Sequence, residues 1–172
     1  IKMTFNHPAS ELIWVVQPED HFDDTISRFG KQWFNFTDDN EFPDKPQQLL
    51  GAASAGGAQL VQTSAFFGLG ENPVHSAKIQ LNGHDRISER DGRWFNLVEP
   101  YQAHSNVPSK GINIFSFSLS PADFQPTGSC NFSRIDNATL NMRLTEKAVS
   151  LYNASGVKTG SRSCIVKIFA RH

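Results

Sequence analysis

The sequence contains few cysteines, methionines and tyrosines, and cysteine is the residue that disulfide-rich secreted proteins and many metal proteins depend on. Among 172 residues there are two cysteines, Cys130 and Cys164, and only two methionines and two tyrosines. Two cysteines are too few for a disulfide framework or for a structural zinc site, which needs about four ligands. We therefore interpret both cysteines as small buried side chains.

Neither a strong net charge nor a long apolar run is present. The 16 Lys and Arg residues balance 17 Asp and Glu residues, so no global charge attracts nucleic acid, and we expect no direct contact with it. No apolar run reaches the roughly 18 residues of a membrane-spanning helix. The first residues, IKMTFNHP, do not resemble a signal peptide. These absences argue against nucleic-acid binding, membrane-spanning and secretion.

The charge that is present is unevenly distributed. Residues 1–50 hold nine acids and four bases, a net charge of −5, whereas residues 51–172 hold eight acids and twelve bases, a net charge of +4. Two interpretations remain open. The two parts form differently solvated surfaces, or they form complementary faces that meet between neighbouring subunits.

Sequence patterns for catalysis are also missing. No Ser or Cys lies in a nucleophile motif such as G-x-S-x-G, so His84 and Asp85 have no partner for a hydrolytic relay. None of the six histidines forms a His-x-His pair. We expect no catalytic residue, no metal site and no cofactor, and hence a protein that is not an enzyme.

What the sequence does contain is a series of short strand patterns between Gly and Pro turns. Apolar residues alternate with polar ones or form short runs, as in half-buried or fully buried strands. Such a series predicts an all-β sandwich or barrel, with helix limited to turns. The seven predicted strands are Leu12–Val16, Trp33–Phe36, Ala77–Asn82, Arg93–Val98, Ile112–Leu119, Ala138–Leu144 and Ile165–Ala170.

Two of these regions carry further local signals. Asn82-Gly83 predicts a tight turn, because both residues tolerate positive φ, and the charged residues after it suggest a turn in which Asp85 pairs with Arg86 and Glu89 with Arg90. In Ile112–Leu119 the apolar alternation slips by one position, which indicates either a β-bulge or burial on both faces.

Four near-contiguous segments stand out in the middle of the chain: KIQLNGHDRISER at Lys78–Arg90, WFNLVEPYQAHSN at Trp94–Asn106, GINIFSFSL at Gly111–Leu119 and QPTGSCNFSRIDNATL at Gln125–Leu140. Together they closely resemble the C-terminal jelly roll of the major capsid proteins of nucleocytoplasmic large DNA viruses, such as iridoviruses, phycodnaviruses and mimiviruses. The segments occur in the family's order, and the resemblance spans most of residues 10–171.

The resemblance implies a fold and a function. Residues 1–172 would be a single eight-stranded antiparallel jelly-roll sandwich, the second half of a double jelly roll in a larger chain. Three such chains would form a pseudo-hexagonal capsomer, as a homotrimer that contacts neighbouring capsomers and minor capsid proteins. The capsomers would tile an icosahedral virion shell that overlies an internal membrane and assembles in the host cytoplasm.

The sequence departs from the family pattern at its ends. Family members carry two jelly rolls and continue beyond the position that matches VKIFARH, whereas this chain ends at His172. We expect the last strand to be incomplete and the chain to be a fragment, with a shortened homologue as the alternative. A second departure is the pair Ala103-His104 after Tyr101-Gln102, where the family tends to have another histidine, which argues further against a metal role.

Two other functions remain as alternatives. A sugar-binding jelly-roll module for virion attachment needs only an exposed aromatic residue and a few polar groups, which Trp33, Trp94 or Tyr101 would supply, although buried strand aromatics are the simpler interpretation. A cupin-like enzyme is the other alternative, and the missing histidine pair argues against it.

Some residues are candidates for modification or assembly. N-x-Ser/Thr sequons occur at Asn35, Asn131, Asn137 and Asn153, and we consider Asn153, Asn35 and Asn137 as possible glycosylation sites. Arg134 and Asp136 are predicted to share a strand face with Ala138 and to form a structural charge pair at the strand's entry or at a subunit contact.

Residues 46–70 form an uncharged segment rich in Gly, Ala, Ser and Gln. An irregular segment of this length within a domain is uncommon and often functional. We interpret it as an insertion in a connecting loop, either a surface loop or a segment that packs against another subunit. Its five bulky apolar residues favour the second interpretation: Leu49, Leu60, Val61, Phe66 and Phe67.

Overall fold

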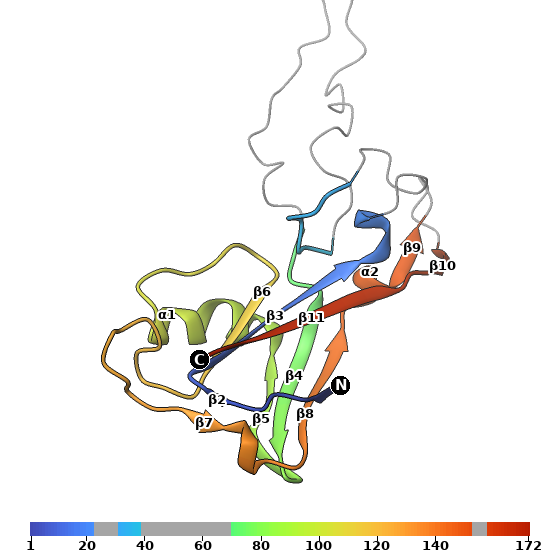
Figure 1. The fold of residues 1–172 in the computed structure, drawn as a ribbon. Helices are drawn as coiled ribbons and strands as arrows, with labels where there is room; N and C mark the ends of the chain where they lie inside the picture. Colours follow the sequence, from blue (N-terminus) through green and yellow to red (C-terminus); the bar gives the residue numbers. More distant parts are fainter. Residues whose placement is uncertain (23–30, 39–69, 153–157) are drawn as a thin grey trace, which may run out of the picture.

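The computed structural model describes residues 1–22, 31–38, 70–152 and 158–172, and these residues form two antiparallel sheets that face each other (Figure 1). The first sheet has the strand order β1-β8-β4-β5. Its strands are β1 (Lys2–Met3), β8 (Ala138–Leu144), β4 (Val74–Leu81) and β5 (His84–Asp91). Because β4 and β8 alternate apolar and polar residues, each turns one face to the interior and the other outward.

The second sheet has the order β11-β3-β6. Its central strand β3 (Glu11–Pro18) pairs with β11 (Cys164–Arg171) along all eight residues and with β6 (Ile112–Ser116) along five. Every residue of β11 is therefore paired with β3, and the expectation that the last strand is incomplete stays a prediction.

Small elements close the two ends of the sandwich. The pair β2 (Pro8–Ala9) and β7 (Cys130–Asn131) lies at one end, and β9 (Ser150–Tyr152) with β10 (Lys158–Ser161) lies at the other (Figure 1). The helical turns are short: η1 (Glu19–His21), the π-helical turn η3 (Trp94–Val98), α1 (Glu99–Ala103), η4 (Phe132–Arg134) and α2 (Glu146–Val149). No helix among the described residues is long and apolar enough to cross a membrane.

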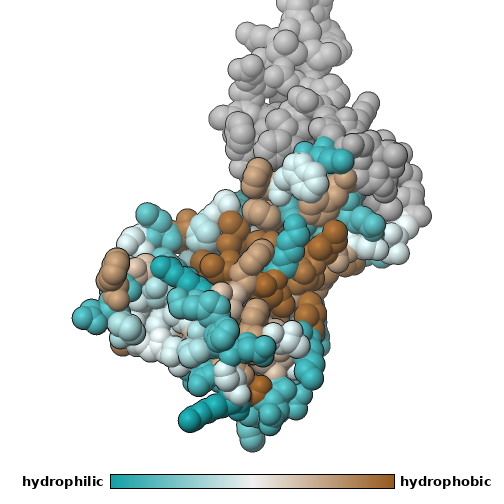
Figure 2. All heavy atoms as spheres, viewed as in Figure 1, coloured by the Kyte–Doolittle hydropathy of each residue, from teal (hydrophilic) through white to brown (hydrophobic). Residues whose placement is uncertain are grey.

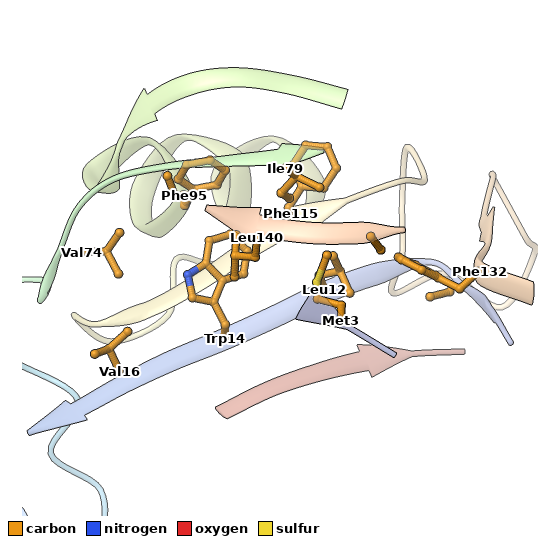
Figure 3. Packing of buried hydrophobic residues seen from close by; sticks show 13 residues of the cluster. Met3, Leu12, Trp14, Val16, Val74, Ile79, Phe95, Phe115, Phe132 and Leu140 are labelled. Atoms are coloured by element: carbon orange, nitrogen blue, oxygen red, sulfur yellow. The ribbon is translucent and has the colours of Figure 1, made fainter. Parts of the chain in front are cut away.

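The core lies between the two sheets (Figure 3). Trp14 of β3 is completely buried, and its ring packs edge-on against Phe95 with 5.1 Å between ring centroids. Ile79 of β4 and Leu140 of β8, also completely buried, line the core from the opposite sheet. Full burial of one such side chain contributes about 1.5–3 kcal/mol, so contacts between the sheets hold the sandwich together.

Five of the seven predicted strands are confirmed, as β3, β4, β6, β8 and β11. The apolar slip in the 112–119 region reflects burial on both faces, because the register of β6 against β3 has no bulge and adjacent Ile114 and Phe115 are both buried. The tight turn is confirmed as well: Asn82 and Gly83 have φ of 50° and 82° and join β4 to β5.

Two predicted strands are wrong. Trp33–Phe36 is an irregular turn, and Arg93–Val98 is helical, running through η3 into α1. The second error has a physical cause: the short, largely apolar segment Trp94–Val98 fits a helix as well as a strand, and Pro100 in the first turn of α1 favours helix there. Strand β5 was missed because it is polar on both faces and mostly exposed.

Candidate functional site

One edge of the three-stranded sheet is closed by helical side chains. The amide Nδ2 of Asn96 donates to the backbone oxygen of Ile112 at 2.8 Å, and the backbone N–H of Ser116 donates to Oε1 of Glu99 at 2.9 Å. Asn96 and Glu99 lie in η3 and α1, so the turn that follows β5 caps the outer edge of β6 at Ile112 and Ser116. Capping by side chains removes a template for further strand pairing.

The opposite edge, along β11, is open. The backbone N–H of Glu19 donates to the backbone oxygen of Ser163, and the backbone N–H of Ser10 donates to the backbone oxygen of Arg171. The odd-numbered residues of β11 therefore direct their backbone groups toward β3. Backbone groups alternate sides along a strand, and the even-numbered residues therefore direct theirs away. Within the described residues no backbone bond reaches these outward groups, which belong to Val166, Ile168 and Ala170.

Apolar side chains accompany this open edge. Ile165 and Phe169 point outward from β11 and are 43% and 56% exposed. Figure 2 shows apolar atoms at the surface over the middle of this face, where Figure 1 draws β3 and β11. Lys167 lies between them in sequence, with its Nζ 5.1 Å from the centre of the Phe22 ring. An unpaired edge beside exposed apolar side chains is typical of a surface that another segment covers.

Two further groups of exposed apolar residues lie elsewhere on the surface. One occupies the helical turn and the loop after it, and the other occupies the loop between β6 and β7. Isolated exposed apolar residues are common, but groups of them mark contact surfaces. The first group consists of Leu97, Val98, Tyr101 and Val107, and the second of Leu119 and Phe124.

The described residues contain no constellation suited to catalysis or metal binding. No group of three or more His, Cys, Asp or Glu side chains among them has metal-binding geometry. His84 is exposed in β5, and His104 bonds to Glu11. The expected local pairs of the charged turn are wrong: Asp85 accepts from Gln80 across the sheet, and Glu89 bonds to Ser76 of β4.

The three aromatic residues considered for sugar binding differ in exposure. Trp33 and Tyr101 are 54% and 74% exposed, whereas Trp94 is half-buried and packs against Phe95. Among the described residues, one surface hollow is lined by Pro121 and another by Lys78, and none of the three aromatic residues lines either hollow. Neither hollow therefore joins these aromatics to polar groups.

The sequons occupy different environments. The amide of Asn35 is held at both ends, since its Nδ2 donates to Gln32 and its Oδ1 accepts from Thr37. Asn131 caps η4 through Ser133. Asn137 is exposed, and its backbone bonds to Asn82 while no bond of its side chain is seen to the residues that the structure describes.

Other predicted positions lie in turns or outside the described residues. Arg134 and Asp136 are both exposed and precede β8, which begins at Ala138, so they do not share its apolar face; no ion pair joins them in the described structure. Asn153 and nearly all of the 46–70 segment lie outside the described residues.

The two cysteines are half-buried and not joined by a disulfide. Burial raises the pKa of both the Cys130 and the Cys164 thiol. This environment agrees with the interpretation of both as packing residues, since only the thiolate is reactive.

The roles of the residues around the closed edge were not predicted from the sequence. Asn96, Glu99 and His104 stand in a segment taken for a strand and its turn, where polar side chains look like ordinary surface positions. Glu11 gave the only local signal, as a lone acid that begins an otherwise apolar strand. Its buried carboxylate shows that this end of β3 is covered.

Comparison with known proteins places the chain in a family. A model of the large eukaryotic DNA virus major capsid protein family matches residues 1–171. The chain belongs to this family. The major capsid protein of Phaeocystis pouchetii virus is 39% identical over 92% of the chain, and that of Paramecium bursaria Chlorella virus 1 is 38% identical over 88%.

Solved capsid structures share the architecture of this family member. The VP54 capsid protein of PBCV-1, in a crystal structure fitted into a reconstruction of the Sputnik virophage, is 30% identical over 99% of the chain, with a TM-score of 0.57. The Faustovirus major capsid protein has a TM-score of 0.61 at 10% identity, a likeness of fold alone. The all-β jelly-roll prediction is confirmed.

The match covers only part of each relative. The chain spans 40% of the Phaeocystis pouchetii virus protein and 32% of the Chlorella virus protein. It also spans 41% of the VP54 chain. The relatives are therefore more than twice as long as the segment described here.

Proposed function

We propose that this chain is the second jelly roll of a double-jelly-roll major capsid protein, a structural component of the virion shell. The observation that carries the proposal is the match of residues 1–171 to the capsid family together with a sandwich that lacks a catalytic or metal-binding constellation among its described residues. A shell protein acts through its shape and contact surfaces, and the features found here are of that kind.

The open edge of β11 supports the view that a longer chain completes the sandwich. One sheet has four strands and the facing sheet has three, and the free position lies beside β11. We propose that a strand from the chain before Ile1 fills it. Met3 of β1 lies next to Leu12 in the core (Figure 3), so a segment that precedes β1 starts close to the sheet it would join.

The higher assembly follows from the same proposal. Three double-jelly-roll chains would form a pseudo-hexagonal capsomer, and capsomers would contact one another and minor capsid proteins in an icosahedral shell over an internal membrane, assembled in the host cytoplasm. The exposed apolar groups at Leu97–Val107 and Leu119–Phe124 support such contacts, because assembly would bury them.

Mass and symmetry measurements on the longer natural protein test this proposal. We expect sedimentation to give a trimer of chains at least twice the length of this segment, and electron microscopy to show particles with pseudo-sixfold outlines. A monomeric longer protein without such particles would contradict the capsomer.

The strand proposal needs its own pair of proteins. The segment extended only at its N-terminus by the natural preceding residues should unfold at a higher temperature than residues 1–172, because the added strand pairs with β11. The segment extended only at its C-terminus is the matched control. If only the C-terminal extension raises the unfolding temperature, the strand that pairs with β11 comes from residues after His172 and not from residues before Ile1.

A further inference from the structure

A buried carboxylate is held between two basic side chains where β3 begins. Glu11 is 1% exposed; its Oε2 lies 2.8 Å from Nε2 of His104, and its Oε1 lies 3.2 Å from Nη1 of Arg171. His104 directly follows α1, and Arg171 ends β11. The carboxylate therefore ties the helical turn to the three-stranded sheet through bonds to residues that are 93 and 160 positions away in sequence.

A second carboxylate lies under the same helical turn. Glu99 is 9% exposed and accepts the backbone N–H of Ser116. Burial raises the pKa of its carboxyl group, whereas the nearby charge of His104 acts to lower it. Both acids become costly when ionised and buried unless a positive charge compensates them.

The charged groups around His104 can be counted by element. β3 supplies Glu11 and no other charged residue, α1 supplies Glu99, β11 supplies Arg171, and β6 supplies none. The other basic residue of β11, Lys167, bonds to Gln17 toward the opposite end of β3. With His104 protonated, two cations balance two carboxylates; with His104 neutral, one cation remains.

We propose that His104 is a proton-dependent latch that holds the helical turn of residues 94–104 against the sheet and loosens it as the pH rises. The imidazole is 19% exposed, so protons from solvent reach it. A hydrogen bond between charged partners is stronger than one from a neutral imidazole. Histidine is the side chain that most often serves as a proton-dependent switch in proteins.

The latch has two structural consequences. Residues 94–104 carry Asn96 and Glu99, which close the edge of β6, so loosening the turn opens that edge. The same turn carries the exposed side chains of Leu97 and Tyr101. Proton binding at His104 therefore sets the position of an apolar contact surface, whether or not the proposed shell architecture is correct.

Hydrogen exchange on the longer natural protein tests the latch. After correction for intrinsic exchange rates, amides of residues 94–104 should exchange about fivefold faster at pH 8 than at pH 5.5, the equivalent of ~1 kcal/mol. The His104→Gln variant, which keeps a neutral donor, should remove this pH difference. His75→Gln, at an exposed histidine on the other sheet, is the matched control and should retain it.

Two further variants separate His104 from Glu99. His104→Lys keeps a positive charge at both pH values, and its exchange should be slow and independent of pH. Glu99→Gln should retain the pH difference, because Glu11 still faces the imidazole. A pH difference that survives in His104→Gln, one that disappears in Glu99→Gln, or no difference in the natural protein would overturn the proposal.

Discussion

Individual backbone positions in this sandwich differ in how much space surrounds them. Gly83 and Gly111 both have positive φ, 82° and 86°. A Cβ added at Gly83 meets nothing within 4 Å, whereas one added at Gly111 would lie 1.8 Å from the backbone oxygen of Phe36. The two glycines therefore separate the cost of a left-handed conformation from the cost of a steric clash.

We expect Gly83→Ala to cost about 1 kcal/mol of unfolding free energy, the typical penalty for an alanine in the left-handed region. Gly111→Ala should cost more than twice as much, because the backbone of Phe36 has to move as well. Urea unfolding of both variants measures the difference. Equal costs would show that the 31–38 segment does not pack against Gly111 in solution.

Glu99 makes the stability depend on pH in a predictable direction. Its pKa is raised by burial, so the folded form binds a proton more readily than the unfolded chain. The stabilisation from this proton is fully present below the unfolded pKa, near 4.5, and is lost as the pH rises through the higher folded value. Glu99→Gln should therefore gain stability relative to the natural protein as the pH rises above about 4.5.

Unfolding curves at several pH values measure this effect. The glutamine retains an oxygen that accepts from Ser116, so the hydrogen bond is preserved while the charge is removed. Glu89→Gln is the contrasting variant, because the pKa of Glu89 is lowered, chiefly by its bond to Ser76. A loss of stability at high pH in Glu99→Gln would contradict the raised pKa of Glu99.

Exposure of the Asn137 side chain leads to a prediction about modification. If the natural protein carries an N-linked glycan at a described sequon, we expect it at Asn137, since a glycan on Nδ2 of Asn35 would compete with the bond from that nitrogen to Gln32. Mass spectrometry of virion protein should locate the glycan, and Asn137→Gln should remove it. A glycan at Asn35 and none at Asn137 would contradict the prediction that Asn137 is the preferred site.

At the scale of elements, the helical turn of residues 94–104 acts as the cap of β6. Asn96 is buried and bonds to the oxygens of both Ser109 and Ile112. Asn96→Ala would leave two carbonyl oxygens without these partners, and we expect a cost of about 1–3 kcal/mol. Calorimetry or urea unfolding measures it.

The matched control for this change is Asn106→Ala, at an exposed asparagine shortly after the same turn. It should change the unfolding free energy by less than about 0.5 kcal/mol, as exposed substitutions usually do. Similar effects of both substitutions would show that the cap contributes little to the stability of β6.

The strands also differ in how well the sequence alone predicts them. Strands with one or two buried faces were predictable, because β3, β4, β8 and β11 carry alternating or continuous apolar residues. β5 was not, since an edge strand without a buried face has no apolar period. The caps at Asn96 and Glu99 depend on contacts with β6, a strand that follows later in the chain, and no local pattern encodes them.

At the scale of the whole molecule, the open edge of β11 predicts self-association. We expect residues 1–172 alone to form dimers at high concentration through this edge and its apolar neighbours. Phe169→Lys should weaken the dimer, because a lysine within an edge strand opposes its pairing with another strand. Sedimentation over a concentration series measures the dissociation constant.

Phe124→Lys is the matched control, a substitution of an equally apolar and fully exposed residue in the loop between β6 and β7. It should leave the dimer unchanged. Equal weakening by the two lysines would place the contact elsewhere, and a monomer at all concentrations would show that the β11 edge is inert by itself.

The unequal edges of the three-stranded sheet also limit how far such pairing can proceed. In the language of polymer chemistry, this sheet is a monofunctional unit: β11 is reactive, and β6 is end-capped by Asn96 and Glu99. Two monofunctional units can couple once, and no chain of units can grow from them. Many copies of this protein can therefore be concentrated in one place without this sheet propagating into a fibril, whereas a sheet with two reactive edges would propagate.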